Sequence, residues 1–236
     1  RSRGLGDVYK RQVAGLAAAF GSGAMTNSIS EIEDADCVFI IGSNTTSSHP
    51  LVATRIFRAK KKGARIIVAD PRTIQLSSLA DITVRQKLGT DVALLNGIMH
   101  VILEKGWHNL SFIQERTEEF EAFSKVIKEY PPEKAAEITG VAAEDILRIA
   151  ELYAKAETAS IVYCMGITQH TTGVDNVKTL ANLAMLTGNV GRESTGVNPL
   201  RGQNNVQGAC DMGGLPNVYP GYQLSLIHIS EPTRPY

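Results

Sequence analysis

The sequence predicts an α/β fold built around a parallel β-sheet. Three short, mainly apolar runs lie at residues 36–41, 65–69 and 160–164, and polar residues bound each of them. Continuous runs of this length are typical of strands that are buried on both faces of a parallel sheet. Segments with helical periodicity separate these strands. The alternation predicts βαβ units, in which ligands bind beyond the carboxyl ends of the strands.

Composition limits the classes of protein to consider. The chain has 236 residues and is 43% hydrophobic, enough for one large domain or two small ones. Its 24 basic and 24 acidic residues balance, so charge gives no reason to expect a nucleic acid or a membrane surface as partner. No apolar run approaches the roughly 20 residues that span a bilayer, and no signal peptide begins the chain.

The cysteines argue for a reducing compartment. Cys37, Cys164 and Cys210 are widely spaced, and none of them belongs to a CxxC pair. The spacing therefore indicates neither a disulfide framework nor a zinc site. A cytoplasmic location is the default expectation.

The first structured segment covers residues 13–32. It is rich in small residues, including Gly15, Gly21 and Gly23, which predicts a short helix followed by a tight turn. Close helix packing by itself would explain these glycines, and we favour that interpretation.

Residues 36–72 predict the first βαβ unit. A helix over 51–62 ends at Gly63, because its basic residues gather near the C-terminus and glycine commonly ends a helix. The loop 42–48 offers backbone N–H groups and hydroxyls for a phosphate. Asp70 could accept hydrogen bonds from a ribose or a guanine edge, and Arg72 could reach a phosphate. No GxGxxG motif is present, so a nicotinamide site is not indicated; a capped helix and an Asp-Pro turn remain the simpler alternative.

The middle of the chain predicts mostly helix. A short strand lies within 80–87, and a helix begins at Thr90 or Asp91 and runs to about Lys105. The turn at Gly89 serves either as a cap or as part of a site. Residues 107–156 predict three or four helical pieces, broken at Pro131-Pro132 and at Gly140, with a solvated charged face.

A second strand–loop–helix unit follows. The strand 160–164 leads into Met165-Gly166-Ile167-Thr168-Gln169-His170, and a helix over 174–186 stops at Gly188. His170 could be a catalytic base, but we favour the interpretation that it lines a pocket.

The most unusual stretch is 196–216. It has no helical or strand period, and it contains five Gly and two Pro together with Arg201 and five carboxamide side chains. Such a segment suits a ligand that needs many donors, close approach of the backbone and one fixed positive charge. The alternative is a long surface loop with ordinary turns.

The run Pro-Leu-Arg-Gly-Gln-Asn-Asn-Val-Gln-Gly-Ala-Cys-Asp-Met-Gly within this stretch resembles the catalytic arginine segment of molybdopterin-guanine-dinucleotide formate dehydrogenases, catalytic (alpha) subunit. The resemblance extends over nearly all of 13–223. It implies an α/β fold with parallel-sheet βαβ lobes of the molybdopterin oxidoreductase type (Rossmann-like), present here incompletely. Residues 13–88 would form part of one α/β dinucleotide-binding lobe. A second cofactor-binding lobe with the arginine loop would cover 89–223.

The resemblance also implies the chemistry. Formate would be oxidised to carbon dioxide at a bis-molybdopterin guanine dinucleotide centre with Mo or W, and Arg201 would hold the formate carboxylate bidentately. The two strand–loop–helix units would hold the two halves of the cofactor. The residues expected to bind it are Gly42, Asn44, Ser48, His49, Asp70, Arg72, Gly89, Asp91, Met165, Gly166, Gln169 and Gln203.

Both ends of the chain look foreign. Residues 1–12 and 224–236 resemble translated sequencing-adapter sequence, so we expect an internal fragment with a non-native head and tail. In the resembling family a selenocysteine or cysteine that binds the metal, followed by histidine, lies a few residues before Val13. No such pair is present here. We therefore expect that this chain contains no metal ligand, that the 4Fe-4S cluster belongs to a missing N-terminal region, and that the chain alone is inactive.

The expected partners are formate and electron-transfer subunits, either iron–sulfur proteins or NAD- or hydrogenase-linked ones. Two alternatives remain open. One is another molybdopterin oxidoreductase, such as a nitrate reductase or a respiratory-complex subunit. The other is a non-catalytic nucleotide-binding module with a regulatory role.

Overall fold

A computed structural model of the chain describes residues 6–214 and 218–224. Within these residues the central element is a five-stranded sheet with the order β3-β2-β1-β4-β5, and every pairing in it is parallel. Its strands are β1 (Cys37–Ile41), β2 (Arg65–Ala69), β3 (Ile82–Val84), β4 (Ala159–Tyr163) and β5 (Gly196–Pro199). The predicted α/β class with a parallel sheet is confirmed.

The strands end at nearly the same level. Ile41, the last residue of β1, pairs with Ala69 at the end of β2 and with Tyr163 at the end of β4. Tyr163 in turn pairs with Pro199, which ends β5. The segments that leave these strands therefore begin side by side along one edge of the sheet. Strands from both predicted lobes share this sheet, and the assignment of residues 13–88 and 89–223 to two cofactor lobes stays a prediction.

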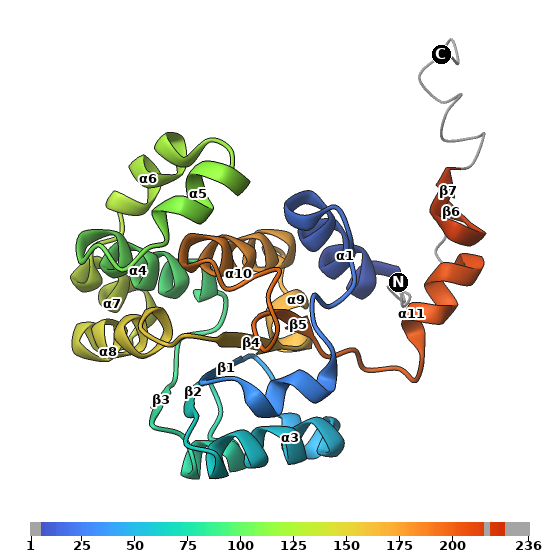
Figure 1. The fold of residues 1–236 in the computed structure, drawn as a ribbon, viewed down its shortest axis with the longest axis horizontal. Helices are drawn as coiled ribbons and strands as arrows, with labels where there is room; N and C mark the ends of the chain where they lie inside the picture. The colour runs from blue at the N-terminus through green and yellow to red at the C-terminus, as the bar shows by residue number, and fades with distance from the viewer. Residues whose placement is uncertain (1–5, 215–217, 225–236) are drawn as a thin grey trace.

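Helices cover both faces of the sheet (Figure 1). On one face lie α3 (Pro50–Lys61) and the 3₁₀ helices η1 (Ile29–Asp34) and η2 (Gln75–Ser78), packed against side chains such as Val38 and Ile66. On the other face lie α4 (Asp91–Glu104), α8 (Ala143–Ala154) and α10 (Gly173–Thr187). Strand side chains alternate between the two layers, as the pleat requires.

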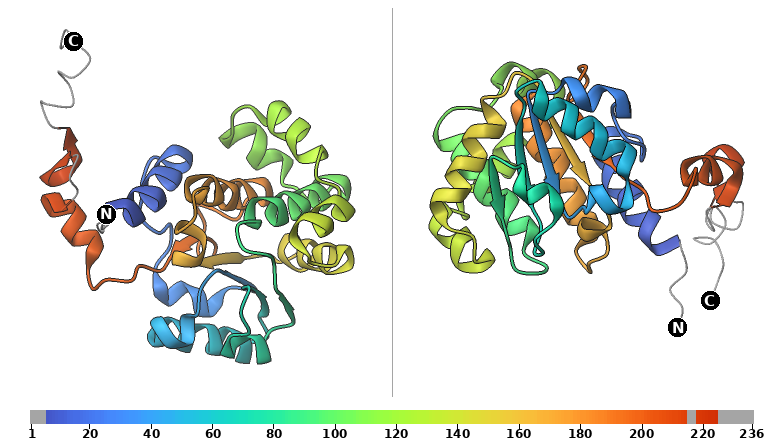
Figure 2. Two further views of the ribbon diagram at one scale, coloured as in Figure 1. Left: turned by 180° about the vertical axis from the view of Figure 1, so that it is seen from behind. Right: turned by 90° about the horizontal axis from the view of Figure 1, so that it is seen from below.

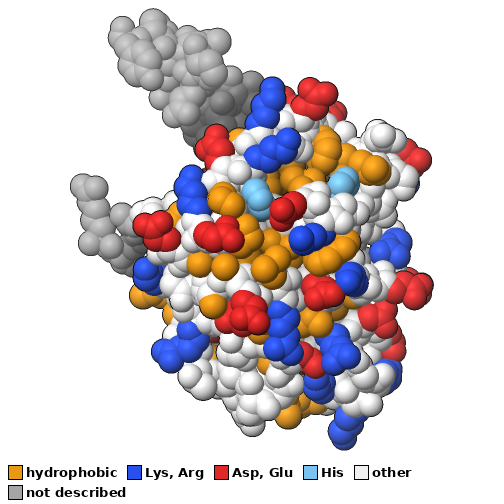
Figure 3. All heavy atoms as spheres, turned by 90° about the vertical axis from the view of Figure 1, so that its left-hand side faces the viewer, with side chains coloured by type: hydrophobic (Ala, Val, Ile, Leu, Met, Phe, Trp, Pro, Cys, Tyr) orange, Lys and Arg blue, Asp and Glu red, His pale blue; other side chains and the backbone are white. Residues whose placement is uncertain are grey.

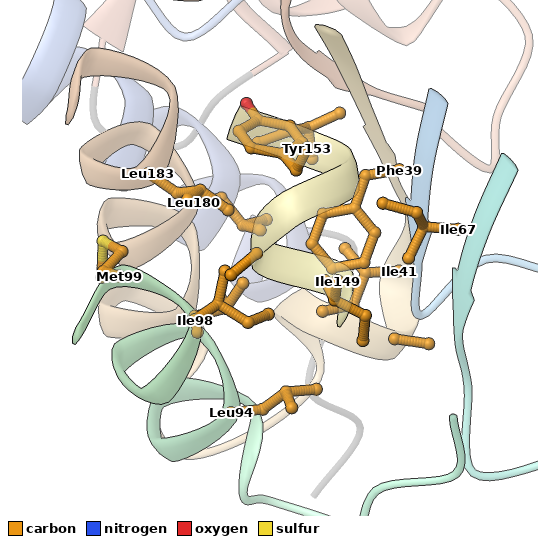
Figure 4. Packing of buried hydrophobic residues seen from close by; sticks show 14 of the residues in the cluster. Phe39, Ile41, Ile67, Leu94, Ile98, Met99, Ile149, Tyr153, Leu180 and Leu183 are labelled. Atoms are coloured by element: carbon orange, nitrogen blue, oxygen red, sulfur yellow. The ribbon is translucent and has the colours of Figure 1, made fainter. Parts of the chain in front are cut away.

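The larger core lies between the sheet and α4, α8 and α10 (Figure 4). Phe39 of β1 meets Tyr153 of α8 edge to face, with ring centroids 6.1 Å apart. Leu180 and Leu183 from α10 approach from the side opposite the strands. All these side chains are fully buried. Their close packing holds the sheet, and therefore its edge, in a fixed position relative to the helices.

The predicted helical middle segment forms four pieces. They are α5 (Leu110–Arg116), α6 (Phe120–Lys128), α7 (Pro132–Thr139) and α8, with breaks at Pro131 and at Gly140, which adopts φ 76°. Figure 3 shows hydrophobic side chains mixed with charged ones on the outer face of this side of the molecule. Ile127 is the one fully buried side chain of α6, so this helix packs lightly on the body.

Helix α1 (Gly6–Phe20) packs along α10 (Figure 1). A Cβ at Gly15 would come within 2.7 Å of Val177. Close helix packing therefore explains this glycine, as favoured from the sequence. The helix begins within the segment predicted to be foreign, and that prediction stays untested.

The stretch 196–216 differs from expectation at its start. It was predicted to have no strand, but Gly196–Pro199 forms β5, the edge strand that pairs with β4. Gly196 makes this possible, because its φ is 94° and a Cβ there would collide with Thr26 and Asn27. Pro199 is tolerated because it ends an edge strand.

The last described elements are short. They are α11 (Val206–Ala209), the π-helical turn η3 (Cys210–Gly214), β6 (Val218–Tyr219), η4 (Pro220–Tyr222) and β7 (Gln223–Leu224). Residues 215–216 of the predicted loop lie outside the described residues. Figure 2 shows the segment from α11 to β7 lying apart from the sheet. Among the described helices, none has the length and apolar character needed to cross a bilayer.

Candidate functional site

A cleft of about 730 Å³ lies at the carboxyl edge of the sheet. Residues that follow β1, β2, β3 and β4 line it together. They are Gly42, Asn44, Ser48, Asp70, Pro71, Arg72, Gln86, Lys87, Leu88, Asp91, Cys164, Met165, Gly166, Gln169 and His170. The sequence assigned these strand ends to two cofactor halves, whereas the structure brings them to one cleft.

Most of the predicted cofactor residues line this cleft, and the exceptions are His49, Gly89 and Gln203. Gly89 adopts φ 79° in the turn before α4 but does not line the cleft. Gln203 is exposed in the segment after β5. His49 turns instead toward the arginine segment, where its ring contacts a backbone carbonyl.

Two glycines form a backbone contact within the cleft lining. The N–H of Gly166 donates to the carbonyl of Gly42 across 3.1 Å. Gly42 has φ 57°, and a Cβ at Gly166 would lie 2.6 Å from the Gly42 oxygen. A side chain at either glycine would force the backbone to move. The two loops can therefore approach this closely only because both residues are glycine.

Asp70 is a buried carboxylate at the end of β2. It is 2% exposed, and its Oδ1 accepts hydrogen bonds from the Arg72 backbone N–H at 2.9 Å and from Arg72 Nε at 3.2 Å. The Arg72 side chain remains 67% exposed. The guanidinium is thus held at the rim of the cleft with most of its surface open to an anionic ligand.

Asp91 and Gln86 form a second buried polar pair. Asp91 is 3% exposed, and Gln86 Nε2 donates to its Oδ1 at 3.0 Å. Burial raises the pKa of Asp91, and the hydrogen bond from Gln86 offsets only part of that rise. Such a carboxylate, with no cation bonded to it among the described residues, suits a ligand that brings N–H donors.

Gln86 was not predicted as a site residue. Its Nε2 faces two acceptors, Asp91 Oδ1 and the Ala69 carbonyl, while its Oε1 is buried without a partner in the described part of the chain. A buried acceptor of this kind is costly unless something donates to it. Its position just after β3, at the edge that was already predicted to bind, is the signal that could have identified it.

His170 and Gln169 come from the loop after β4. The His170 ring places Nε2 at 2.8 Å from the Gly166 carbonyl, and both residues line the cleft. The carbonyl can only accept, so His170 donates to it. The structure places His170 in the cleft lining, as favoured from the sequence, and its role there stays a prediction. Met165, at the start of this loop, lines the same cleft.

Arg201 follows β5 on the same edge but does not line the cleft. The Leu200 N–H donates to the Tyr163 carbonyl at 2.8 Å, which continues the sheet by one residue. Arg201 Nη2 donates to the Gly23 carbonyl at 2.7 Å. Gly202 approaches Met165, with 3.7 Å between a Cβ at that position and the Met165 Sδ. The arginine segment therefore lies directly beside the cleft, in contact with one of its lining residues.

The described residues contain no cluster of three or more side chains that could hold a metal ion. The prediction that a metal ligand precedes Val13 is not tested by this observation. The lining offers carboxylates, carboxamides, backbone groups and rim cations, a set suited to an organic phosphate ligand rather than to a bare metal ion.

Comparison with known proteins gives a consistent picture. The molybdopterin oxidoreductase family profile matches residues 6–234. The chain is 59% identical over 215 residues to F420-dependent formate dehydrogenase 1 subunit alpha from Methanococcus maripaludis, a match that covers 91% of this chain and 32% of that protein. It is 51% identical over 211 residues to formate dehydrogenase H from Escherichia coli, covering 89% and 30% respectively.

Acetylene hydratase from Pelobacter acetylenicus has a similar structure, with a TM-score of 0.66 and 25% identity, over 78% of this chain and 24% of that one. The chain thus spans about a third of the length of the curated relatives it matches.

Proposed function

The chain belongs to the molybdopterin oxidoreductase family, and from this membership we propose that it forms the cofactor-binding and formate-orienting part of a formate dehydrogenase catalytic subunit. The relatives named formate dehydrogenase support formate as the substrate. The observation that carries the proposal is the position of Arg201, on the sheet edge that bears the cleft and beside Met165 of its lining.

Arg201 would orient the substrate. A guanidinium stays charged at any working pH and can hold a carboxylate through two parallel N–H···O bonds. Holding formate in one orientation removes rotational freedom before the reaction. The positive charge also stabilises negative charge on the carboxylate oxygens as the C–H bond breaks. When bound, the Mo or W centre of the cofactor would take up the two electrons.

The cleft would take one dinucleotide. Its volume of about 730 Å³ is within the range of sites for a single organic ligand of this class. Asp70, Asp91 and Gln86 supply buried acceptors for the N–H edge of a guanine, and Arg72 and Lys87 supply cations at the rim for phosphates. We therefore propose that this chain holds one of the two pterin guanine dinucleotides. The second dinucleotide and the 4Fe-4S cluster would be held elsewhere in the whole protein.

The partners follow from the same proposal. Electrons from formate would leave through electron-transfer subunits, either iron–sulfur proteins or NAD- or hydrogenase-linked ones. A cytoplasmic location is part of the proposal, and it is supported by Cys37, Cys164 and Cys210, which form no disulfide among the described residues.

The test uses the whole protein, recovered from the source DNA and expressed anaerobically. Formate-dependent viologen reduction is measured for the unchanged protein, Arg201→Lys and Arg192→Lys. Arg192 is the matched control, because its guanidinium also bonds to carbonyls, those of Gly188 and Glu157, but does not line the cleft.

We expect Arg201→Lys to lower kcat/KM by about 10²–10³-fold, since lysine cannot make the bidentate contact, and Arg192→Lys to stay close to the unchanged protein. Nitrate-dependent oxidation of reduced viologen, without formate-dependent viologen reduction, would assign the protein to another branch of the family. The 236-residue chain by itself should show no formate oxidation, and measurable turnover by it would contradict the proposal.

A further inference from the structure

The backbone around Arg201 is held by side chains from two other strand-end segments. The Cys164 Sγ, just after β4, lies 2.9 Å from the Leu200 carbonyl oxygen. The His49 Nε2, in the segment after β1, lies 2.7 Å from the Arg201 carbonyl oxygen. Two consecutive carbonyls of the arginine segment are thus bonded to residues that are far away in the sequence.

The contact with His49 fixes the tautomer of the ring. A carbonyl oxygen can only accept, so Nε2 must carry the proton that is shared with Arg201. Nδ1 is buried and has no partner in the described part of the chain. The ring therefore makes one directed hydrogen bond, and that bond goes to the backbone of Arg201 rather than into the cleft, which His49 does not line.

His49 is also rigidly mounted. It precedes Pro50, the first residue of α3, and a residue before proline has a restricted backbone. Its own N–H donates to the Thr45 carbonyl at 2.8 Å, and its carbonyl accepts the Ala53 N–H at 3.0 Å. The imidazole therefore holds the backbone of Arg201 at a fixed position relative to the start of α3.

From these contacts we propose that His49 is a positioning residue for Arg201, which it holds through the Nε2–H to carbonyl hydrogen bond. The proposal rests on the proposed role of Arg201 in holding formate. Arg201 is anchored at its guanidinium by Gly23 and at its backbone by His49. Loss of the backbone anchor lets the backbone at Arg201 shift, and the guanidinium shifts with it. A displacement of about 1 Å is enough to cost on the order of a hundredfold in rate.

Three substitutions in the whole enzyme test the proposal. His49→Ala removes the donor, and His49→Gln places an amide N–H close to the former Nε2. His100→Ala is the matched control, because His100 Nδ1 also bonds to a carbonyl, that of Ile127 at 3.1 Å, and neither of these two residues lines the cleft. The readouts are kcat and KM for formate, thermal unfolding, and the pterin and guanine nucleotide content of the purified protein.

We expect His49→Ala to raise the KM for formate about tenfold or more with little change in cofactor content. His49→Gln should recover most of that loss, and His100→Ala should leave both kinetic constants unchanged. If His49→Ala does not fold, His49→Asn replaces it, because its shorter side chain does not reach the Arg201 carbonyl. The proposal then requires a raised KM in His49→Asn and not in His49→Gln.

Other outcomes overturn the proposal in distinguishable ways. Lower cofactor content with an unchanged KM would make His49 a cofactor-binding residue. Unchanged kinetics in His49→Ala beside a collapse in Arg201→Lys would remove His49 but keep the proposed function. Unchanged kinetics in Arg201→Lys would remove the proposed function itself.

Discussion

The two ends of the parallel sheet differ in how their charged groups are paired. At the amino end, Glu33 bonds to Arg55 and Arg58, and Asp81 bonds to Lys60 and Arg65 at 2.6 and 3.0 Å. A hollow of about 600 Å³ is present there too, and charged side chains of both signs line it, as they line the cleft at the other end. At the carboxyl end Asp70 pairs with Arg72, but Asp91 is buried against an amide, with no ion pair to it among the described residues.

This difference distinguishes charged groups that stabilise the fold from charged groups that are available to a ligand. Both ends are concave and polar, so shape alone would not choose between them. The amino end satisfies its own charges, whereas among the described residues of the carboxyl end Gln86 Oε1 is buried without a donor and Asp91 is buried without an ion pair. Incomplete pairing in a concave region is the physical mark of a ligand site.

The largest expected effect comes from the glycine contact at the carboxyl end. In Gly166→Ala the new Cβ would lie 2.6 Å from the Gly42 oxygen and 2.7 Å from its Cα, both of them backbone atoms. We expect a loss of about 3 kcal/mol in the free energy of unfolding, measured with urea.

Gly63→Ala at the amino end is the control for this prediction. Gly63 has φ 102°, but a Cβ there would meet nothing within 4 Å. The strained backbone alone should cost about 1–2 kcal/mol. Equal losses in the two variants would mean that the loops at the carboxyl end can separate, and the cleft would then not be preformed.

Smaller effects of opposite sign on the free energy of unfolding are expected from substitutions at the partly buried Asp81 and at the buried Asp91. Burial alone would raise the pKa of Asp81, but hydrogen bonds from Lys60, the Ile66 N–H and Arg65 hold it below the usual value. Asp81→Asn should therefore lower the free energy of unfolding at pH 7, by about 2 kcal/mol. Burial raises the pKa of Asp91, so Asp91→Asn should increase the stability of the ligand-free chain by a smaller amount.

The same pair of variants gives opposite pH dependences. The contribution of Asp81 is complete above its unfolded pKa of about 3.9 and is lost as the pH falls through its lowered folded pKa. The penalty from Asp91 is absent below about pH 3.9 and grows as the pH rises through its raised folded pKa. Neighbouring Asp70 adds to that rise, and His170 opposes it.

Urea unfolding at pH 7 and pH 4 measures the pH dependence that comes from Asp91, and the loss of the Asp81 contribution is measured below about pH 3.9. Asp91→Asn should differ from the unchanged chain at pH 7 and converge with it at pH 4. Asp91→Asn that is less stable at pH 7 would show that the carboxylate is satisfied without a ligand, and the contrast between the two sheet ends would disappear.

The sequence predicted the strands that carry strong apolar runs. β1, β2 and β4 lie within one residue of their expected bounds, because such runs have one stable place in a parallel sheet. β5 was missed, since Gly196–Pro199 has no strand propensity and becomes a strand only through pairing with β4. Tertiary pairing of this kind is not encoded in local periodicity.

The candidate site likewise has residues that local sequence predicted and contacts that depend on the tertiary structure. Asp70 and Arg72 were predicted because they directly follow a strand at a binding edge, and Asp91 was predicted because the family resemblance implied cofactor contacts at its turn. The joining of both units into one cleft depends on the strand order, in which β1 lies between β2 and β4. The contact between His49 and Arg201 spans 152 residues, so spacing could not reveal it.

The smallest expected effect compares one substitution, Lys to Met, at the two ends. Lys155 bonds to Glu151 at 2.7 Å, and its Nζ lies 4.7 Å from the centre of the Trp107 ring, but the Lys155 side chain is half exposed. Lys155→Met should lower the free energy of unfolding by about 0.5 kcal/mol, and this difference should shrink in 1 M salt. Lys87→Met at the cleft rim removes only a 3.3 Å bond to the Glu137 carbonyl and should change stability even less.

For ligand affinity we expect the reverse order, with a larger effect from Lys87→Met than from Lys155→Met. Lys87 lines the cleft and Lys155 does not, so Lys87→Met should weaken the binding of guanosine diphosphate by about tenfold, as expected for the loss of one charge-assisted phosphate contact. Lys155→Met should leave the affinity unchanged in calorimetric titrations. If both variants bind equally well, the phosphates do not lie at this rim, and Arg72 would be the cation to change next. If Lys155→Met alone weakens binding, the nucleotide occupies the amino-end hollow, and the assignment of the two ends is reversed.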